Sequence, residues 1–99
     1  MNIIIDENAK VKINEIINEK KFNFRSFRLS ITSLSRITGP VFDLVFDEAN
    51  QFDQVYKVDD LDIIVDNGLN RRINEIEILY KEGSTKSGFV VNTDFMKIK

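Results

Sequence analysis

The stretch ITGPVFDLVFDE, residues 37–48, decides the fold class that we expect for this chain. It contains Gly39-Pro40, a pair typical of turns, and Phe42, Leu44 and Phe46 then follow at every second position. Because successive side chains of a β-strand point to opposite faces of a sheet, this period of two indicates a strand with one buried face. A turn that leads into such a strand predicts sheet structure in the middle of the chain.

The segment before this turn has the same period. Phe27, Leu29 and Ile31 are apolar and the positions between them are polar, which predicts a strand within Arg25–Ser33. The short apolar run Asn2–Ile5 is typical of an edge strand, or of a strand that pairs with the C-terminal region.

Two segments carry helix signals. Asp6 can accept a backbone N–H as an N-cap, and apolar residues then recur at helical spacing, which predicts an amphipathic helix that ends at Lys20-Lys21. A short helix is expected after the turn residues Asp66-Asn67-Gly68, because Leu69 and Ile73 lie one helical turn apart.

Short apolar or alternating runs between turn residues predict the remaining strands. These runs are Val55–Val58 and Leu61–Val65 on either side of Asp59-Asp60, Ile76–Tyr80, and Gly88–Val91 after a polar loop at Lys81–Ser87. No repeat or long linker divides the chain, so we expect one α+β domain over residues 1–99, with the last few residues as a flexible tail.

The composition suits a single core. The 99 residues are 42% hydrophobic and include eight Phe, and a chain of this length buries roughly 60 to 65% of its unfolded surface. The N-terminal MNIIIDENAKVK has only a short apolar run before charged residues begin, far from the ~20 residues that a membrane span needs. We therefore expect a cytoplasmic protein without membrane association.

The acidic residues gather in one part of the sequence. Within residues 43–66 the only base is Lys57, and the acids are Asp43, Asp47, Glu48, Asp53, Asp59, Asp60, Asp62 and Asp66. This distribution, with a pI near 5.1, argues against a nucleic-acid partner. The group Asp59, Asp60, Asp62 and Asp66 could hold a hard cation, dock a basic protein partner, or form a solvated edge. We expect the solvated edge, with docking of a basic partner as the first functional alternative and cation binding as the second.

Arg25, Arg28 and Arg36 form a second charged candidate. We expect an ordinary solvated surface rather than a phosphate or nucleic-acid site, because the aromatic residue between them belongs to an apolar strand face. Phe22 and Phe24 either pack beneath the end of the helix, which is the commoner outcome, or form an exposed interface.

The residue types give little support to catalysis. The chain contains no cysteine and no histidine, and its hydroxyl residues lie in no nucleophile motif such as GxSxG or SxxK. The four glycines are isolated, so no phosphate-binding loop is present either. We expect a protein that is not an enzyme and that uses no cofactor.

Several segments, taken in order, resemble the HesB/IscA group, the A-type proteins of iron-sulfur cluster biogenesis. Residues 37–48 resemble its CSGxxYxxxxDE segment, and IIIDENAKVKINEII at 3–17 is similar to its first strand and helix. VDDLDIIVD and IEILY look like its central VxVxVD and IDY segments, and GFVVN at 88–92 resembles GFxxxNP. The resemblance implies a compact mixed β-sheet with one N-terminal helix and one short helix.

The departures from this group concern its metal ligands. Members that carry clusters use one cysteine in the CSG segment and a CGCG pair near the C-terminus. Here Ile37 stands at the first position. After Asn92-Thr93 the sequence reads DFMKIK, just before the place where the resemblance puts the paired cysteines. Ile37 is thus a lost ligand position, which we expect to pack within its turn, with an apolar partner contact as the alternative.

Three functions stay open. The first is a non-enzymatic binding or interaction module that has lost the iron-sulfur ligands. The second is an accessory cluster-assembly protein that acts with a cysteine-bearing partner, and the third is a small-molecule binder or enzyme of unknown type. The resemblance and the short strands with exposed edges are also compatible with a homodimer.

Overall fold

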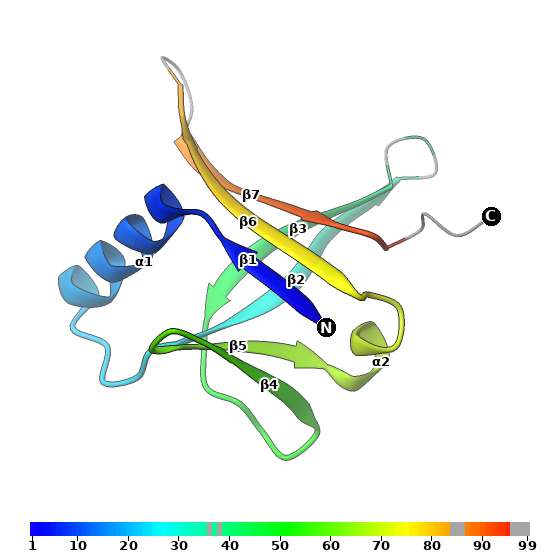
Figure 1. The fold of residues 1–99 in the computed structure, drawn as a ribbon, viewed down its shortest axis with the longest axis horizontal. Helices are drawn as coiled ribbons and strands as arrows, with labels where there is room; N and C mark the ends of the chain where they lie inside the picture. The colour runs from blue at the N-terminus through cyan, green and yellow to red at the C-terminus, as the bar shows by residue number, and fades with distance from the viewer. Residues whose placement is uncertain (36, 38, 84–86, 96–99) are drawn as a thin grey trace.

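The computed structural model describes residues 1–35, 37, 39–83 and 87–95 of the chain (Figure 1). Its elements follow in the order β1 (Asn2–Ile5), α1 (Glu7–Lys20), β2 (Ser26–Ser35), β3 (Gly39–Phe46), β4 (Asp53–Val58), β5 (Leu61–Asp66), α2 (Asn67–Asn70), β6 (Glu75–Glu82) and β7 (Ser87–Thr93). The predicted α+β class, with one main helix and one short helix, is therefore confirmed.

The strands form two sheets, and both are mixed. The four-stranded sheet has the order β3-β2-β5-β4, in which β2 and β5 are parallel and the other pairs antiparallel. The three-stranded sheet has the order β1-β6-β7, in which β1 and β6 are parallel. The expected edge strand at Asn2–Ile5 is thus present.

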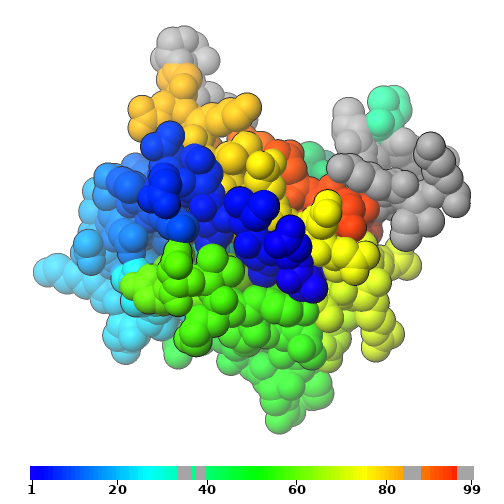
Figure 2. Space-filling view, in the orientation of Figure 1, coloured from blue at the N-terminus to red at the C-terminus, as the bar shows by residue number. Residues whose placement is uncertain are grey.

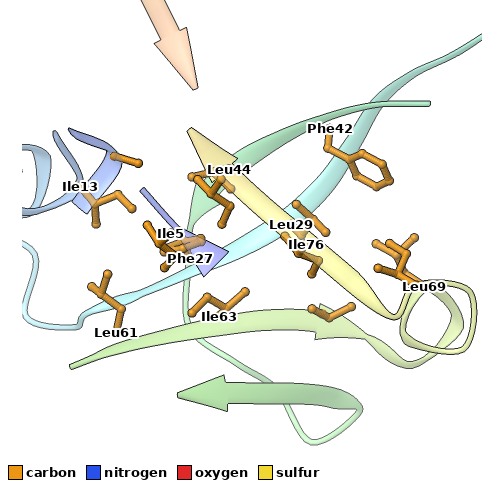
Figure 3. Close-up of a cluster of buried hydrophobic side chains, with 14 of the residues drawn as sticks. Ile5, Ile13, Phe27, Leu29, Phe42, Leu44, Leu61, Ile63, Leu69 and Ile76 are labelled. Atoms are coloured by element: carbon orange, nitrogen blue, oxygen red, sulfur yellow. The ribbon is translucent and has the colours of Figure 1, made fainter. Parts of the chain in front are cut away.

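One hydrophobic core joins both sheets and the helices. Figure 3 shows side chains from α1, both sheets and the α2 region pointing into the same interior. The fully or nearly fully buried members are Ile5, Ala9, Ile13, Ile17, Phe27, Leu29, Phe42, Leu44, Leu61, Ile63, Val65, Leu69, Ile73, Ile76 and Ile78. The apolar spacing in the sequence identified most of these residues because it follows strand and helix geometry.

The β2–β3 hairpin follows the period of two only in its inner half. Phe27 and Leu29 are buried, whereas Ile31 is exposed and a register shift follows it. The expectation that Gly39-Pro40 forms the turn is wrong, since both residues pair with β2 at the start of β3. An edge strand tolerates proline because the missing N–H can face away from the sheet.

Two other hairpins are placed by their register. Asp59-Asp60 was compatible with a tight hairpin or a bend, and the structure shows the hairpin: Val58 pairs with Leu61, and Asp59 has a positive φ of 55°. The predicted loop at residues 81–87 is too long, because Lys81 and Glu82 continue β6 opposite β7. The pairing with β7 outweighs the weak strand preference of these polar residues.

Helix α1 begins and ends near the predicted residues. Asp6 takes the N-cap position, but its side chain makes no capping hydrogen bond, and its backbone N–H instead donates to the Ile78 carbonyl oxygen. Phe22 stacks on Phe24 and Phe46 beyond the helix end, so these rings pack rather than form a separate exposed patch. Within the described residues, neither helix has the length and apolar character needed to cross a membrane.

Candidate functional site

Ile37 lies in the turn between β2 and β3 and is 94% exposed. The expectation that it packs within this turn is therefore wrong for the single chain. The reason is that the outer half of the hairpin extends beyond the core, as the exposure of Ile31 and Val41 also shows. The neighbouring Arg36 lies outside the described residues, so the basic patch predicted with it is not described as a whole.

The end of β7 comes to the same hairpin. The Phe95 ring lies edge-on to the Phe42 ring of β3 at 6.1 Å between centroids, and the Arg72 guanidinium lies 5.9 Å from the Phe95 ring centre. In Figure 1 the start of β3 and the end of β7 lie on one side of the molecule. The fold thus places the residues that follow β7 against the inner part of the β2–β3 hairpin, at Phe42.

The four predicted surface aspartates do not converge on one point. Each faces its own partner within the chain. The pairs are Asp59 with Lys10 at 2.7 Å, Asp60 with Arg25 at 3.0 Å, Asp62 with Lys57 at 2.8 Å, and Asp66 with the backbone N–H of Leu69 at 2.9 Å. The described residues contain no group of three or more acids placed to hold a metal ion. Their use as a partner surface stays a prediction.

A different carboxylate cluster, which the sequence reasoning missed, surrounds Arg28. The Arg28 guanidinium donates to both oxygens of Asp53 at 2.8 Å, and its Nε donates to Asp47 at 3.2 Å. The Asp53 side chain is only 3% exposed, and it also accepts a hydrogen bond from the Asn50 N–H. Arg28 is thus paired with carboxylates and is not part of an open basic patch.

These contacts shift the acidity of the groups involved. Hydrogen bonds from Arg28 and then from the Asn50 N–H hold the pKa of Asp53 below its usual value. The Glu48 N–H, followed by Arg28, lowers the pKa of Asp47. The same interactions raise the pKa of Arg28, with Asp53 as the main cause. The cluster therefore stays charged at neutral pH.

The connection between β3 and β4, residues 47–52, runs from one edge of the four-stranded sheet to the other. Arg28 forms ion pairs with Asp47 at the start of the connection and with Asp53 directly after it. In addition, Ser26 Oγ donates to the Asp47 carbonyl oxygen, and the Phe52 N–H donates to the Asn50 side chain at 2.8 Å. Beside it lies a groove of about 340 Å³, which we call the outer groove. It is lined by Phe24, Arg25, Ser26, Glu48, Ala49, Val55, Asp62 and Ile64.

Comparison with known proteins gives a result at the level of the fold. No family model and no curated protein matches the sequence. Among solved structures, Escherichia coli SufA, which is involved in biosynthesis of iron-sulfur clusters, matches at a TM-score of 0.70 and 16% identity over 92% of this chain and 79% of SufA. A protein from Aquifex aeolicus, solved by NMR, matches at a TM-score of 0.66 and 16% identity over 93% of this chain and 94% of its own.

The order of strands and helices predicted from the sequence thus has a known structural counterpart. The match spans nearly the whole of this chain, whereas the identity is too low to carry residue roles from one protein to the other. The resemblance to the HesB/IscA group is confirmed as a likeness of fold: this chain, which contains no cysteine, folds as SufA does.

Proposed function

We propose that this chain is a non-enzymatic interaction module, built on a SufA-like fold, that does not ligate an iron-sulfur cluster itself. One observation carries the proposal: the sequence contains neither cysteine nor histidine. Iron-sulfur clusters in proteins are held by thiolates, and imidazole is the usual substitute. A symmetric second copy would add no such ligand either, because it has the same composition.

The position of Ile37 supports this proposal. An aliphatic side chain that is 94% exposed stands in the turn where the resemblance places a ligand cysteine. It cannot coordinate iron, but an exposed apolar side chain can contact a protein partner. Val41 on the adjoining strand is an exposed apolar side chain as well.

The carboxyl groups with shifted pKa values fit a structural role better than a catalytic one. Within the described residues, the pKa shifts of Asp47, Asp53 and Asp94 are all downward and arise from ion pairs or hydrogen bonds to backbone N–H groups. A general acid or base that works at neutral pH needs the opposite shift for a carboxyl group. Stabilised carboxylates of this kind fit a structural role.

Anaerobic reconstitution tests the proposal. The purified chain is incubated with ferrous iron, sulfide and a thiol reductant, desalted, and examined by visible absorption and iron analysis. We expect no protein-bound iron and no visible band, while a four-cysteine ferredoxin treated in parallel gains both. A visible band that stays with this chain after desalting would contradict the proposal.

The SufA-like fold favours one alternative, an accessory role beside a cysteine-bearing assembly protein. In that case the chain should form a complex with a cluster-loaded protein of this fold, detected by co-elution in gel filtration with the cluster absorbance. Ile37→Asp should weaken this complex. Independent elution of the two proteins at micromolar concentration would argue against the accessory role.

A further inference from the structure

The outer face of the four-stranded sheet carries a row of side chains across all of its strands. Arg28 pairs in register with Val45 on one side and with Ile64 on the other, and Ile64 pairs with Val55. Val45 and Val55 are each 46% exposed at the sheet edges, whereas Ile64 is fully buried between them. Among the strand residues that line the outer groove, Val55 at the β4 edge therefore offers apolar surface to a partner.

The wall of this groove is held in place before any partner arrives. Glu48 and Ala49 belong to the β3–β4 connection, whose two ends are tied to Arg28 through Asp47 and Asp53. A binding surface that is already ordered pays less conformational entropy on association. Figure 2 shows this connection and β4 at the lower rim of the molecule, where they are open to approach.

The charge on this face is unbalanced. Its acidic side chains are Asp43, Asp47, Glu48, Asp53, Asp62 and Asp66. Arg28 and Lys57 oppose them, and each is already engaged in an ion pair, as is Arg25 with Asp60. Of the charged residues that line the groove, Arg25 and Asp62 are paired with Asp60 and Lys57, whereas Glu48 makes no ion pair with any described residue. The groove therefore offers the Glu48 carboxylate beside the exposed side chain of Val55.

We propose that the outer groove docks an extended segment of a partner protein in which lysine or arginine alternates with aliphatic residues. The aliphatic side chains of this segment cover Val55, and a cationic end meets the Glu48 carboxylate. This inference rests on the proposed interaction function and names the chemistry of the partner. It places the docking face on the outer groove, with Asp62 as the one member shared with the aspartates predicted from the sequence.

Fluorescence anisotropy with a labelled eight-residue peptide of alternating Lys and Val tests the proposal. We expect saturable binding that weakens in about 1 M salt, because charge attraction across an exposed surface is screened. Glu48→Lys should weaken binding roughly five- to tenfold, and Val55→Ser should weaken it to a smaller extent. An acidic peptide of alternating Glu and Val should not bind.

Matched variants on α1 separate the groove from general effects. Glu19→Lys changes the net charge as Glu48→Lys does, and Val11→Ser removes another exposed valine, so both should bind the basic peptide as the wild type does. Thermal unfolding checks that each variant is folded. If Glu48→Lys does not fold, Glu48→Gln takes its place in the comparison.

Several results would overturn the proposal. These are absence of binding, equal binding of the acidic peptide, or a loss in Glu19→Lys as large as in Glu48→Lys. Self-association of the chain that Glu48→Lys abolishes would assign the groove to a second copy instead. If the basic peptide does not bind and reconstitution gives no cluster, the docking role of the outer groove is refuted and the proposed function is not. A cluster bound by the chain would refute the proposed function itself.

Discussion

At the scale of single residues, Arg28 joins three parts of the chain through one guanidinium group. It lies on β2 and pairs with Asp47 after β3 and with Asp53 at the start of β4. Its side chain is 22% exposed and that of Asp53 is 3% exposed, so Asp53 would be poorly hydrated without this partner. A buried carboxylate that loses its cation is costly, whereas an exposed ion pair contributes little.

Arg28→Met should therefore lower the free energy of unfolding by about 1 to 3 kcal/mol, because it leaves Asp53 unpaired. Lys57→Met is the matched control on the same sheet face, since Lys57 is 71% exposed and pairs with Asp62. It should cost less than about 1 kcal/mol. Urea denaturation of both variants measures the difference, and equal losses would show that the Arg28 cluster is no more than a surface ion pair.

The lowered pKa values of Asp47, Asp53 and Asp94 predict loss of stability in acid. A carboxyl group whose pKa is lower in the folded protein than in the unfolded chain stabilises the fold at pH values above its unfolded-state pKa, which is about 3.9 for Asp. That stability is lost as the pH falls through the lower folded-state value. Urea denaturation should give a lower free energy of unfolding at pH 3 than at pH 7. This difference should be smaller for Arg28→Met than for the wild type. The same fall in both proteins would contradict the assignment to Arg28.

Ile37→Asp tests the exposure of the turn residue. Because the side chain is 94% exposed, we expect a nearly unchanged melting temperature. Ile63→Asp, which puts the same carboxylate into the core, should prevent stable folding. A large loss of stability in Ile37→Asp would mean that this side chain is buried in solution, for example between two copies of the chain.

At the scale of elements, helix α1 ends in a left-handed residue. Lys21 has φ 56° and ψ 40°, and its backbone N–H reaches the carbonyl oxygens of Asn18 and Ile17. This conformation suits glycine, since a side chain at positive φ is strained. Lys20, one residue earlier, is still helical, where glycine is unfavourable.

Lys21→Gly should accordingly stabilise the protein by about 0.5 to 1 kcal/mol. Lys20→Gly removes the same charge one position earlier and should destabilise it by about 0.5 to 1 kcal/mol. Differential scanning calorimetry of the two variants gives the comparison. Shifts of the same sign would show that lost charge or side-chain packing, and not the backbone conformation, governs this helix end.

At the scale of the whole molecule, one core joins both sheets with α1. Ile13 of α1, Ile63 of the four-stranded sheet and Ile76 of the three-stranded sheet all belong to it. A shared core makes partial unfolding of one sheet unfavourable, because the apolar face of the other would be exposed. The chain should thus unfold as a single cooperative unit.

Ile13→Ala, Ile63→Ala and Ile76→Ala should each lower the free energy of unfolding by about 2 to 5 kcal/mol. Circular dichroism and tyrosine fluorescence should report the same transition midpoint for every variant. Val11→Ala on the exposed side of α1 is the control and should have little effect. Midpoints that differ between the two probes would show that the sheets unfold separately.

Local sequence patterns predicted most elements but not all of their ends. The alternation at Phe27 and Leu29 was sufficient for β2 because it depends on near neighbours in the chain. The short helix α2 is present as predicted, but it includes Asn67-Gly68, which were expected to form a turn, and it ends at Asn70, before Ile73. The errors at Gly39-Pro40 and at Lys81 arose where a paired strand outweighed turn preference. The exposure of Ile37 could not be predicted, because it depends on how far the hairpin extends beyond the core.

The sequence by itself determined the α+β class and the lack of thiol and imidazole ligands, since periodicity is local and composition does not change on folding. Only the tertiary structure decided that Arg28 meets Asp47 and Asp53, which lie 19 and 25 residues away, and that an acidic groove opens beside them. Those contacts follow from the strand order β3-β2-β5-β4, which sends the β3–β4 connection from one sheet edge to the other. Strand order is set by packing of the entire chain, and no local pattern of residues encodes it.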